Sequence, residues 1–278
     1  MLVLTVLAML AFAANSVLCR QALEQTTIDA ASFTTLRLIS GALVLWLLVR
    51  WRQEAASIPG SWGSALALFA YAAGFSFAYL TLPTGTGALL LFGAVQLTMS
   101  AGGLWTGERP GPWQLAGTLL AFAGLVYLLS PGIEAPQPPG AMLMIGAGIA
   151  WGVYSLRGQG ERQPLGATAG NFLRSVPMAL VLGLFALPWL QWDVRGALLA
   201  LASGALASGI GYAIWYAVLP GLRPTSAATV QLSVPVLAAA GGALLLAEPI
   251  TPRLLIASLA ILGGIALVLW APRRATSA

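Results

Sequence analysis

The chain has 278 residues, of which 59% are hydrophobic and only 8% are charged. Because soluble domains carry about 25% charged residues, this composition excludes a protein with an ordinary water-soluble core. The net charge of +5 comes from 13 arginines without any lysine, and in a membrane protein such charges report orientation rather than a nucleic-acid partner. Histidine is absent and Cys19 is the single cysteine, which argues against metal sites and against histidine or cysteine catalysis.

Ten long apolar segments follow one another along the chain, separated by turn-forming proline and glycine residues. A transmembrane helix needs about 20 mostly apolar residues, which is roughly the length of each segment. The first segment lacks the basic start and the cleavage site of a secretory signal, so we interpret it as a retained span. The sequence predicts an all-α integral membrane protein with spans at 2–19, 30–49, 62–82, 86–106, 112–130, 140–156, 165–187, 196–218, 225–247 and 252–271.

The second half of the chain repeats the first at an offset of 137 residues. The tetrapeptide Ala-Leu-Val-Leu occurs at 42–45 and again at 179–182. The same offset relates Arg20 to Arg157, Glu24 to Glu161, Leu36-Arg37 to Leu173-Arg174, Tyr79 to Tyr216, and Leu82-Pro83 to Leu219-Pro220. Five spans per repeat is an odd number, so the two halves must cross the membrane in opposite orientations. We therefore expect two inverted five-helix repeats around a central cavity, with the substrate site where the halves meet.

The domain boundaries follow from this duplication. The segment between 131 and 139 is rich in proline and is the predicted linker. We expect the first repeat over 1–130, the second over 140–272, and a cytoplasmic tail at 273–278.

The two copies of one stretch resemble the signature of EamA-type transporters in the drug/metabolite transporter superfamily. These are LRPTSAATVQLSVPVLAAAGGALLLAEPITP at 222–252 and the weaker LPTGTGALLLFGAVQLTMSAGGLWTGERPGP at 82–112. The resemblance covers the whole chain. It implies ten helices, with spans 1–4 and 6–9 around the cavity and spans 5 and 10 at the periphery. Relatives of this kind move amino acids, nucleosides, sugar phosphates or drugs, so the resemblance does not choose a substrate.

One departure from related transporters bears on energy coupling. Small multidrug-resistance relatives carry a first-span glutamate that binds protons and cations. Phe12 occupies the aligned position here, and Ile149 occupies it in the second repeat. The chain therefore lacks the residue for that proton-coupled mechanism. Glu108 and Glu248 precede prolines at turns, where we expect them to act structurally at the N-terminus of the following helix.

Arg37 and Arg174 are the charged residues predicted to lie deep within spans. Charged groups in a membrane interior are costly and usually functional, and an arginine fork suits a substrate carboxylate. The alternative is that each arginine clamps backbone carbonyls or extends along its helix toward the membrane surface.

Aromatic and amide side chains recur at helical spacing on the predicted cavity spans. Polar-tipped rings suit amphipathic or aromatic solutes, whereas lipid-facing belts, ordinary packing and hydrogen bonds between helices are the alternatives. The predicted substrate-binding residues are Asn15, Tyr79, Gln96, Trp151, Tyr154, Tyr212 and Trp215, together with Arg37 and Arg174.

These features favour a secondary transporter that works by alternating access. We expect small amphipathic or zwitterionic substrates, with export of amino acids, including aromatic ones, as the best match. A facilitative channel or a lipid-translocating protein is the alternative, and a membrane-embedded enzyme fits least because no nucleophile–base pair is evident. The expected partners are a small-molecule substrate and membrane lipid, with no nucleic acid and no cofactor, in a monomer.

The distribution of arginines predicts the topology. With a cytoplasmic N-terminus, three arginines fall outside, and eight fall inside, namely Arg50, Arg52, Arg109, Arg157, Arg162, Arg223, Arg273 and Arg274. This bias satisfies the positive-inside rule and places both termini in the cytoplasm of a cell with the protein in its inner membrane. Reporter fusions after Arg52 and Arg162 should score cytoplasmic, and a fusion within 131–139 should score external. A cytoplasmic linker would contradict the inverted arrangement.

Overall fold

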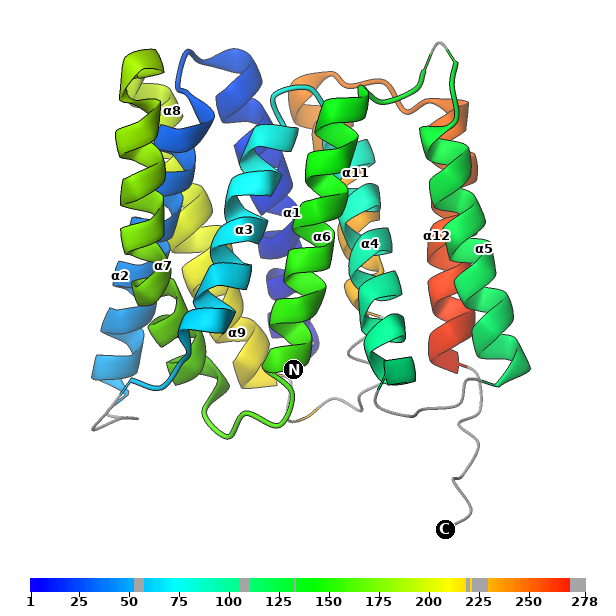
Figure 1. Ribbon diagram of the computed structural model, residues 1–278, viewed down its shortest axis with the longest axis horizontal. Coiled ribbons are helices and arrows are strands. Elements are labelled where there is room, and N and C mark those ends of the chain that lie inside the picture. The colour runs from blue at the N-terminus through cyan, green and yellow to red at the C-terminus, as the bar shows by residue number, and fades with distance from the viewer. Residues whose placement is uncertain (53–57, 106–110, 133, 219–220, 222–229, 271–278) are drawn as a thin grey trace.

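Helices stand side by side in a bundle in the computed structural model (Figure 1). The structure describes residues 1–52, 58–105, 111–132, 134–218, 221 and 230–270. Within these residues it contains helices and no strands: α1 (Leu2–Gln25), α2 (Ala30–Trp51), α3 (Trp62–Ala78), α4 (Thr84–Trp105), α5 (Pro112–Leu129), α6 (Pro138–Arg157), α7 (Pro164–Ala186), the short η1 (Leu187–Trp189), α8 (Val194–Ala202), η2 (Ser203–Ile210), α9 (Gly211–Val218), α11 (Ser233–Leu246) and α12 (Pro252–Trp270).

Eight of the described helices are long and apolar enough to cross a membrane, counting α8, η2 and α9 as one continuous helix. Two shorter apolar helices, α3 and α11, accompany them. Each of the ten predicted apolar segments coincides with one of these helices. The described part of the chain is therefore all-helical, and its helices have the length and apolar composition of a multi-pass membrane protein. In the ninth predicted span, helix α11 starts at Ser233, and residues 222–229 lie outside the described part.

Short side chains and prolines define the helix starts. The Asp29 carboxylate accepts a hydrogen bond from the Ser32 amide at 2.8 Å, and the Ser61 hydroxyl accepts one from the Ser64 amide at 3.1 Å. These bonds satisfy amides that have no partner within the helix. Proline occupies the first turn of α5, α6 and α7, where its missing amide costs nothing.

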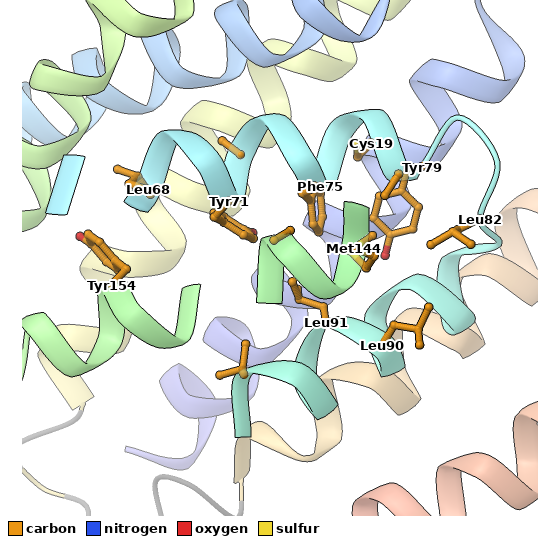
Figure 2. Close-up of a cluster of buried hydrophobic side chains, with 14 of the residues drawn as sticks. Cys19, Leu68, Tyr71, Phe75, Tyr79, Leu82, Leu90, Leu91, Met144 and Tyr154 are labelled. Atoms are coloured by element: carbon orange, nitrogen blue, oxygen red, sulfur yellow. The ribbon is translucent and has the colours of Figure 1, made fainter. Parts of the chain in front are cut away.

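The packing places one helix pair apart from the rest. Helices α5 and α12 stand together at one edge of the bundle (Figure 1). In the remainder, α3 packs on α6, α2 packs on α7, and α1 packs along α8, η2 and α9. Helix α4 joins α6 to α11. The buried side chains of these helices form two hydrophobic clusters, and the larger one includes Tyr71, Phe75 and Met144 in the close-up of Figure 2.

Small residues bring α5 and α12 into backbone contact. A side-chain carbon added at Gly264 would lie 2.5 Å from the Gly117 carbonyl oxygen and 2.6 Å from the Ala121 amide nitrogen. Backbone atoms cannot move aside as a flexible side chain would. The adjacent Gly263 instead faces open space, with nothing within 4 Å of the added carbon.

This difference between neighbouring glycines predicts different mutational costs. Gly264→Ala should lower the free energy of unfolding by roughly 1–3 kcal/mol, because the extra methyl forces the two helices apart. Gly263→Ala is the matched control and should be neutral or slightly stabilising, since alanine favours a helix over glycine. Melting of the two purified variants in detergent measures the difference. Equal melting temperatures would contradict the close packing.

Candidate functional site

A cavity lies among the helices that form the centre of the bundle. Its volume of about 50 Å³ has room for a few water molecules, each of which needs about 10–15 Å³. Ligand pockets usually measure 300–1,000 Å³, so a metabolite enters only if the helices move apart. The lining residues come from α1, α3, α4, α6, η2, α9 and the helical residues just before α11: Phe12, Asn15, Ser16, Tyr71, Phe75, Leu91, Phe92, Trp151, Ala207, Ser208, Tyr212 and Gln231.

Aromatic rings from both halves of the chain form one wall. The Trp151 ring lies 4.7 Å from the Tyr71 ring and 5.6 Å from the Tyr212 ring, measured between centroids. Phe12 lies 5.5 Å from Tyr212. These separations are those of favourable aromatic pairs. The wall can therefore stack against a flat or apolar part of a ligand.

Hydrogen bonds link the polar side chains beside this wall. The Ser203 hydroxyl donates to Asn15 Oδ1 at 2.5 Å. Asn15 Nδ2 donates to the Tyr71 hydroxyl at 3.4 Å, and Arg37 Nη2 donates to the same oxygen at 3.0 Å. The Tyr71 hydroxyl therefore joins α1 and α2 to α3, and Asn15 extends the arrangement to η2.

Arg37 is a buried cation with few partners. Its side chain is only 2% exposed, and the guanidinium lies 4.7 Å from the Phe75 ring and 5.2 Å from the Tyr71 ring. Both contacts have cation–π geometry. Its Nε and Nη1 atoms have no hydrogen-bond acceptor among the described residues. Tyr71 and Phe75 separate this charge from the cavity.

Arg174 has a different environment from its sequence counterpart. Its Nη1 atom donates to the Gly170 carbonyl at 3.0 Å and to the Pro59 carbonyl at 3.3 Å. This is the geometry of a backbone clamp between α7 and the segment that precedes α3. Arg174 does not line the cavity.

The structure brings three of the predicted site residues to the cavity wall: Asn15, Trp151 and Tyr212. The Tyr154 ring stacks on the Trp151 ring, with 5.2 Å between the ring centroids. Its hydroxyl accepts a hydrogen bond from Asn171 Nδ2 at 3.4 Å. The Trp215 ring packs edge-on against the ring of the cavity residue Phe12, with 6.1 Å between the ring centroids. Gln96 is half-buried on α4 and is not among the lining residues. Substrate contact stays a prediction for all of these residues.

Tyr79 lies away from the cavity although it follows Tyr71 and Phe75 along the same face of α3 (Figure 2). Its side chain is fully buried, and its hydroxyl donates to the Thr84 carbonyl at 3.2 Å. A substrate contact by Tyr79 would require this bond to break.

The η2 segment contributes to the cavity wall, and the sequence analysis did not predict it. It has the wider i→i+5 hydrogen bonding of a π-helix, which is rare and frequently found at functional sites. Ala207 and Ser208 on this segment line the cavity, and Ser203 orients Asn15. The added carbon of a residue larger than Gly204 would collide with the Arg37 carbonyl. The only sequence signal is the pair of Ser-Gly dipeptides at 203–204 and 208–209.

A charged cluster links helix ends at the end of the bundle opposite the chain start. Both oxygens of Glu248 accept from the Thr84 amide, at 3.0 and 2.8 Å. Glu248 also forms an ion pair with Arg20 at 3.3 Å, and Arg20 pairs with Glu24 at 2.6 Å. The expectation that Glu248 acts on the helix that follows it was therefore wrong, because it caps α4. Glu108 lies outside the described residues.

Comparison with known proteins identifies the class of protein that has this fold and cavity. The model of the EamA-like transporter family matches residues 1–130 and again 138–270. The chain therefore belongs to the EamA-like transporter family, within the drug/metabolite transporter superfamily.

Individual relatives agree with this assignment. An uncharacterized protein of Pseudomonas aeruginosa is 59% identical over 98% of this chain and 95% of its own length. The threonine/homoserine exporter RhtA of Escherichia coli K12 is 29% identical over 84% of this chain and 80% of its own length. A solved crystal structure shares the fold with a TM-score of 0.67 and 21% identity, covering 95% of this chain and 96% of the other.

The contacts of Glu248 predict that its substitution lowers stability but does not change the coupling of transport to protons. Glu248→Gln should lower the free energy of unfolding by roughly 1–3 kcal/mol, because the α4 cap and the Arg20 pair are both weakened. The exposed Glu24 is the matched control, and Glu24→Gln should cost less than about 1 kcal/mol. Melting curves measure both effects. The pH dependence of flux should be unchanged in Glu248→Gln, and a folded variant that lost a proton-driven flux would contradict the structural role.

Proposed function

We propose that this protein is a secondary transporter of small amphipathic or zwitterionic metabolites, and that it exports amino acids, including aromatic ones. The observation that carries the proposal is the cavity, in which rings and uncharged polar groups from both halves of the chain surround one small space. Such a lining suits an organic solute with an apolar body and a few hydrogen-bonding groups. The names of two relatives support an amino-acid substrate, a threonine/homoserine exporter and a probable amino-acid metabolite efflux pump that is 26% identical over 66% of this chain.

Two inverted repeats, 1–130 and 140–272 with the linker 131–139 between them, form the basis of the proposed mechanism. The packing supports this arrangement, because contacts recur with the two halves exchanged. Helix α3 packs on α6 as the α8–η2–α9 helix packs on α1, while α2 pairs with its counterpart α7 and α5 with α12. The chain start and the end of α12 lie at one side of the bundle, and the α5–α6 connection lies at the other (Figure 1).

Alternating access follows from this symmetry. In an inverted repeat, each half can adopt the conformation of the other, which opens the cavity to the opposite side. The Arg20–Glu248 pair and the Thr84 cap join α1, α4 and the segment after α11 at one end of the bundle, and we infer that this end is closed in the present conformation. We place that end outside the cell and both termini in the cytoplasm, in the inner membrane, because the arginine distribution favours it.

None of the cavity-lining residues carries a charge. No group of histidine, cysteine, aspartate and glutamate side chains suited to a metal ion occurs in the described part of the chain. The uncharged lining supports recognition of the substrate by stacking and hydrogen bonds.

Flux through proteoliposomes tests the proposal. Saturable uptake of an aromatic amino acid with counterflow supports a transporter, whereas non-saturating flux indicates a channel. Trp151→Ala should raise the half-saturating concentration by about threefold to tenfold, because one stacking ring is worth roughly 0.5–1.5 kcal/mol. Trp62→Ala is the matched control, since Trp62 is exposed at the start of α3, and it should leave the half-saturating concentration unchanged. Equal effects of the two substitutions would contradict a substrate site at Trp151.

A further inference from the structure

The buried Arg37 charge lacks a counterion among the described residues. The ion pairs of the described chain involve Arg20 with Glu24 and Glu248, and none reaches Arg37. Its Nε and Nη1 atoms have no acceptor in this part of the chain either. A charge inside a membrane protein is costly unless it is paired, and Arg remains protonated in proteins. The site therefore offers an uncompensated positive charge one side chain away from the cavity.

Tyr71 connects this charge to the cavity. A phenolic oxygen can accept two hydrogen bonds and donate one. The two acceptor positions of Tyr71 are taken by Arg37 Nη2 at 3.0 Å and Asn15 Nδ2 at 3.4 Å. No described residue accepts the Tyr71 proton, and Tyr71 lines the cavity. Its O–H group is therefore a donor available to a ligand, and the guanidinium that polarises its oxygen strengthens that donor.

Asn15 presents a second donor at the same place. The Ser203 hydroxyl holds Asn15 Oδ1 at 2.5 Å, which orients the amide so that Nδ2 faces Tyr71. The amide nitrogen carries two protons, and Tyr71 takes one of them. The other is available beside the Tyr71 hydroxyl, since Asn15 also lines the cavity. Two neighbouring hydrogen-bond donors with a cation behind them match a ligand group that only accepts hydrogen bonds.

We propose that the ligand of this cavity is a carboxylate compound, and that its carboxylate binds at Tyr71 and Asn15 with Arg37 as a positioning and charge-supplying residue behind them. The proposal rests on the transport function above and names the group that the site recognises. The cavity wall contains no acidic residue to pair with an ammonium group. Affinity should therefore depend on the carboxylate of an amino acid far more than on its amine, while the rings of Trp151 and Tyr212 contact the apolar part.

Binding of four matched compounds to the purified full-length protein in nanodiscs tests this assignment. The compounds are 3-phenylpropionate, phenylalanine, 3-phenylpropanamide and phenylalaninamide, so that carboxylate and amine vary independently. The two carboxylates should bind at least about tenfold more tightly than the two amides, because a hydrogen bond to a charged group is worth roughly 1.5–3 kcal/mol. Equilibrium dialysis of the labelled compounds gives the dissociation constants.

Tyr71→Phe removes the donor and keeps the ring. It should weaken binding of both carboxylates by about tenfold and change binding of the amides by less than about twofold. Arg37→Lys should retain part of the carboxylate preference because the charge remains, whereas Arg37→Met should lose it. Tyr127→Phe on α5 is the matched control and should leave all four constants unchanged.

Three results would overturn the assignment. These are amides that bind as tightly as carboxylates, a Tyr71→Phe variant that weakens all four compounds equally, and wild-type protein that binds neither carboxylate. Failure of the transport proposal is a separate result, because carboxylates would then bind with the predicted selectivity but show no saturable flux in proteoliposomes.

Discussion

Backbone hydrogen bonding within each span is the constraint on which the rest of this structure depends. In hydrocarbon, an unpaired amide or carbonyl costs several kcal/mol, so the chain must satisfy these groups inside its own helices. The exposed side chains that face lipid then need only be apolar, and Leu119, Phe122 and Leu259 are examples. Polar side chains are concentrated between helices, where Asn15, Ser203 and Tyr71 satisfy one another. The cavity exists where these groups and the aromatic rings meet.

The η2 segment departs from regular α-helix geometry at the cavity. In η2 each hydrogen bond closes a wider turn, which changes the direction of the side chains that follow. The segment presents Ser208 to the cavity and carries Ser203 to Asn15. Conversion of this turn to ordinary α-helix would rotate α9 and with it Tyr212. Movement of this kind is a direct way to enlarge a cavity that now has space for only a few water molecules.

The two arginines at equivalent sequence positions show how related halves acquire different roles. Both follow a leucine near the middle of a span, and sequence alone cannot distinguish them. Arg174 lies close to backbone carbonyls of Gly170 and Pro59, and these bonds stabilise its charge. Arg37 lies instead between Tyr71 and Phe75, and only one of its nitrogen atoms has an acceptor in the described residues. The second half has Ser208 where the first has Tyr71, so the duplicated pattern does not reproduce the site.

The sequence by itself determined the class of the protein, its membrane spans and its family, because hydrophobic length and the duplicated motif are local properties of the chain. It also predicted Asn15, Trp151 and Tyr212 as site residues, and these three line the cavity, because polar side chains in apolar helices tend to lie between helices. Tertiary structure alone decided which rings meet, because helical spacing does not say how far each helix is rotated or shifted along its axis. Tyr79 and Tyr71 share one face of α3, yet they are two turns apart, and only Tyr71 reaches the level of the cavity. The π-helical turn and the unequal surroundings of the two arginines likewise arise from contacts between distant segments, and no local pattern encodes them.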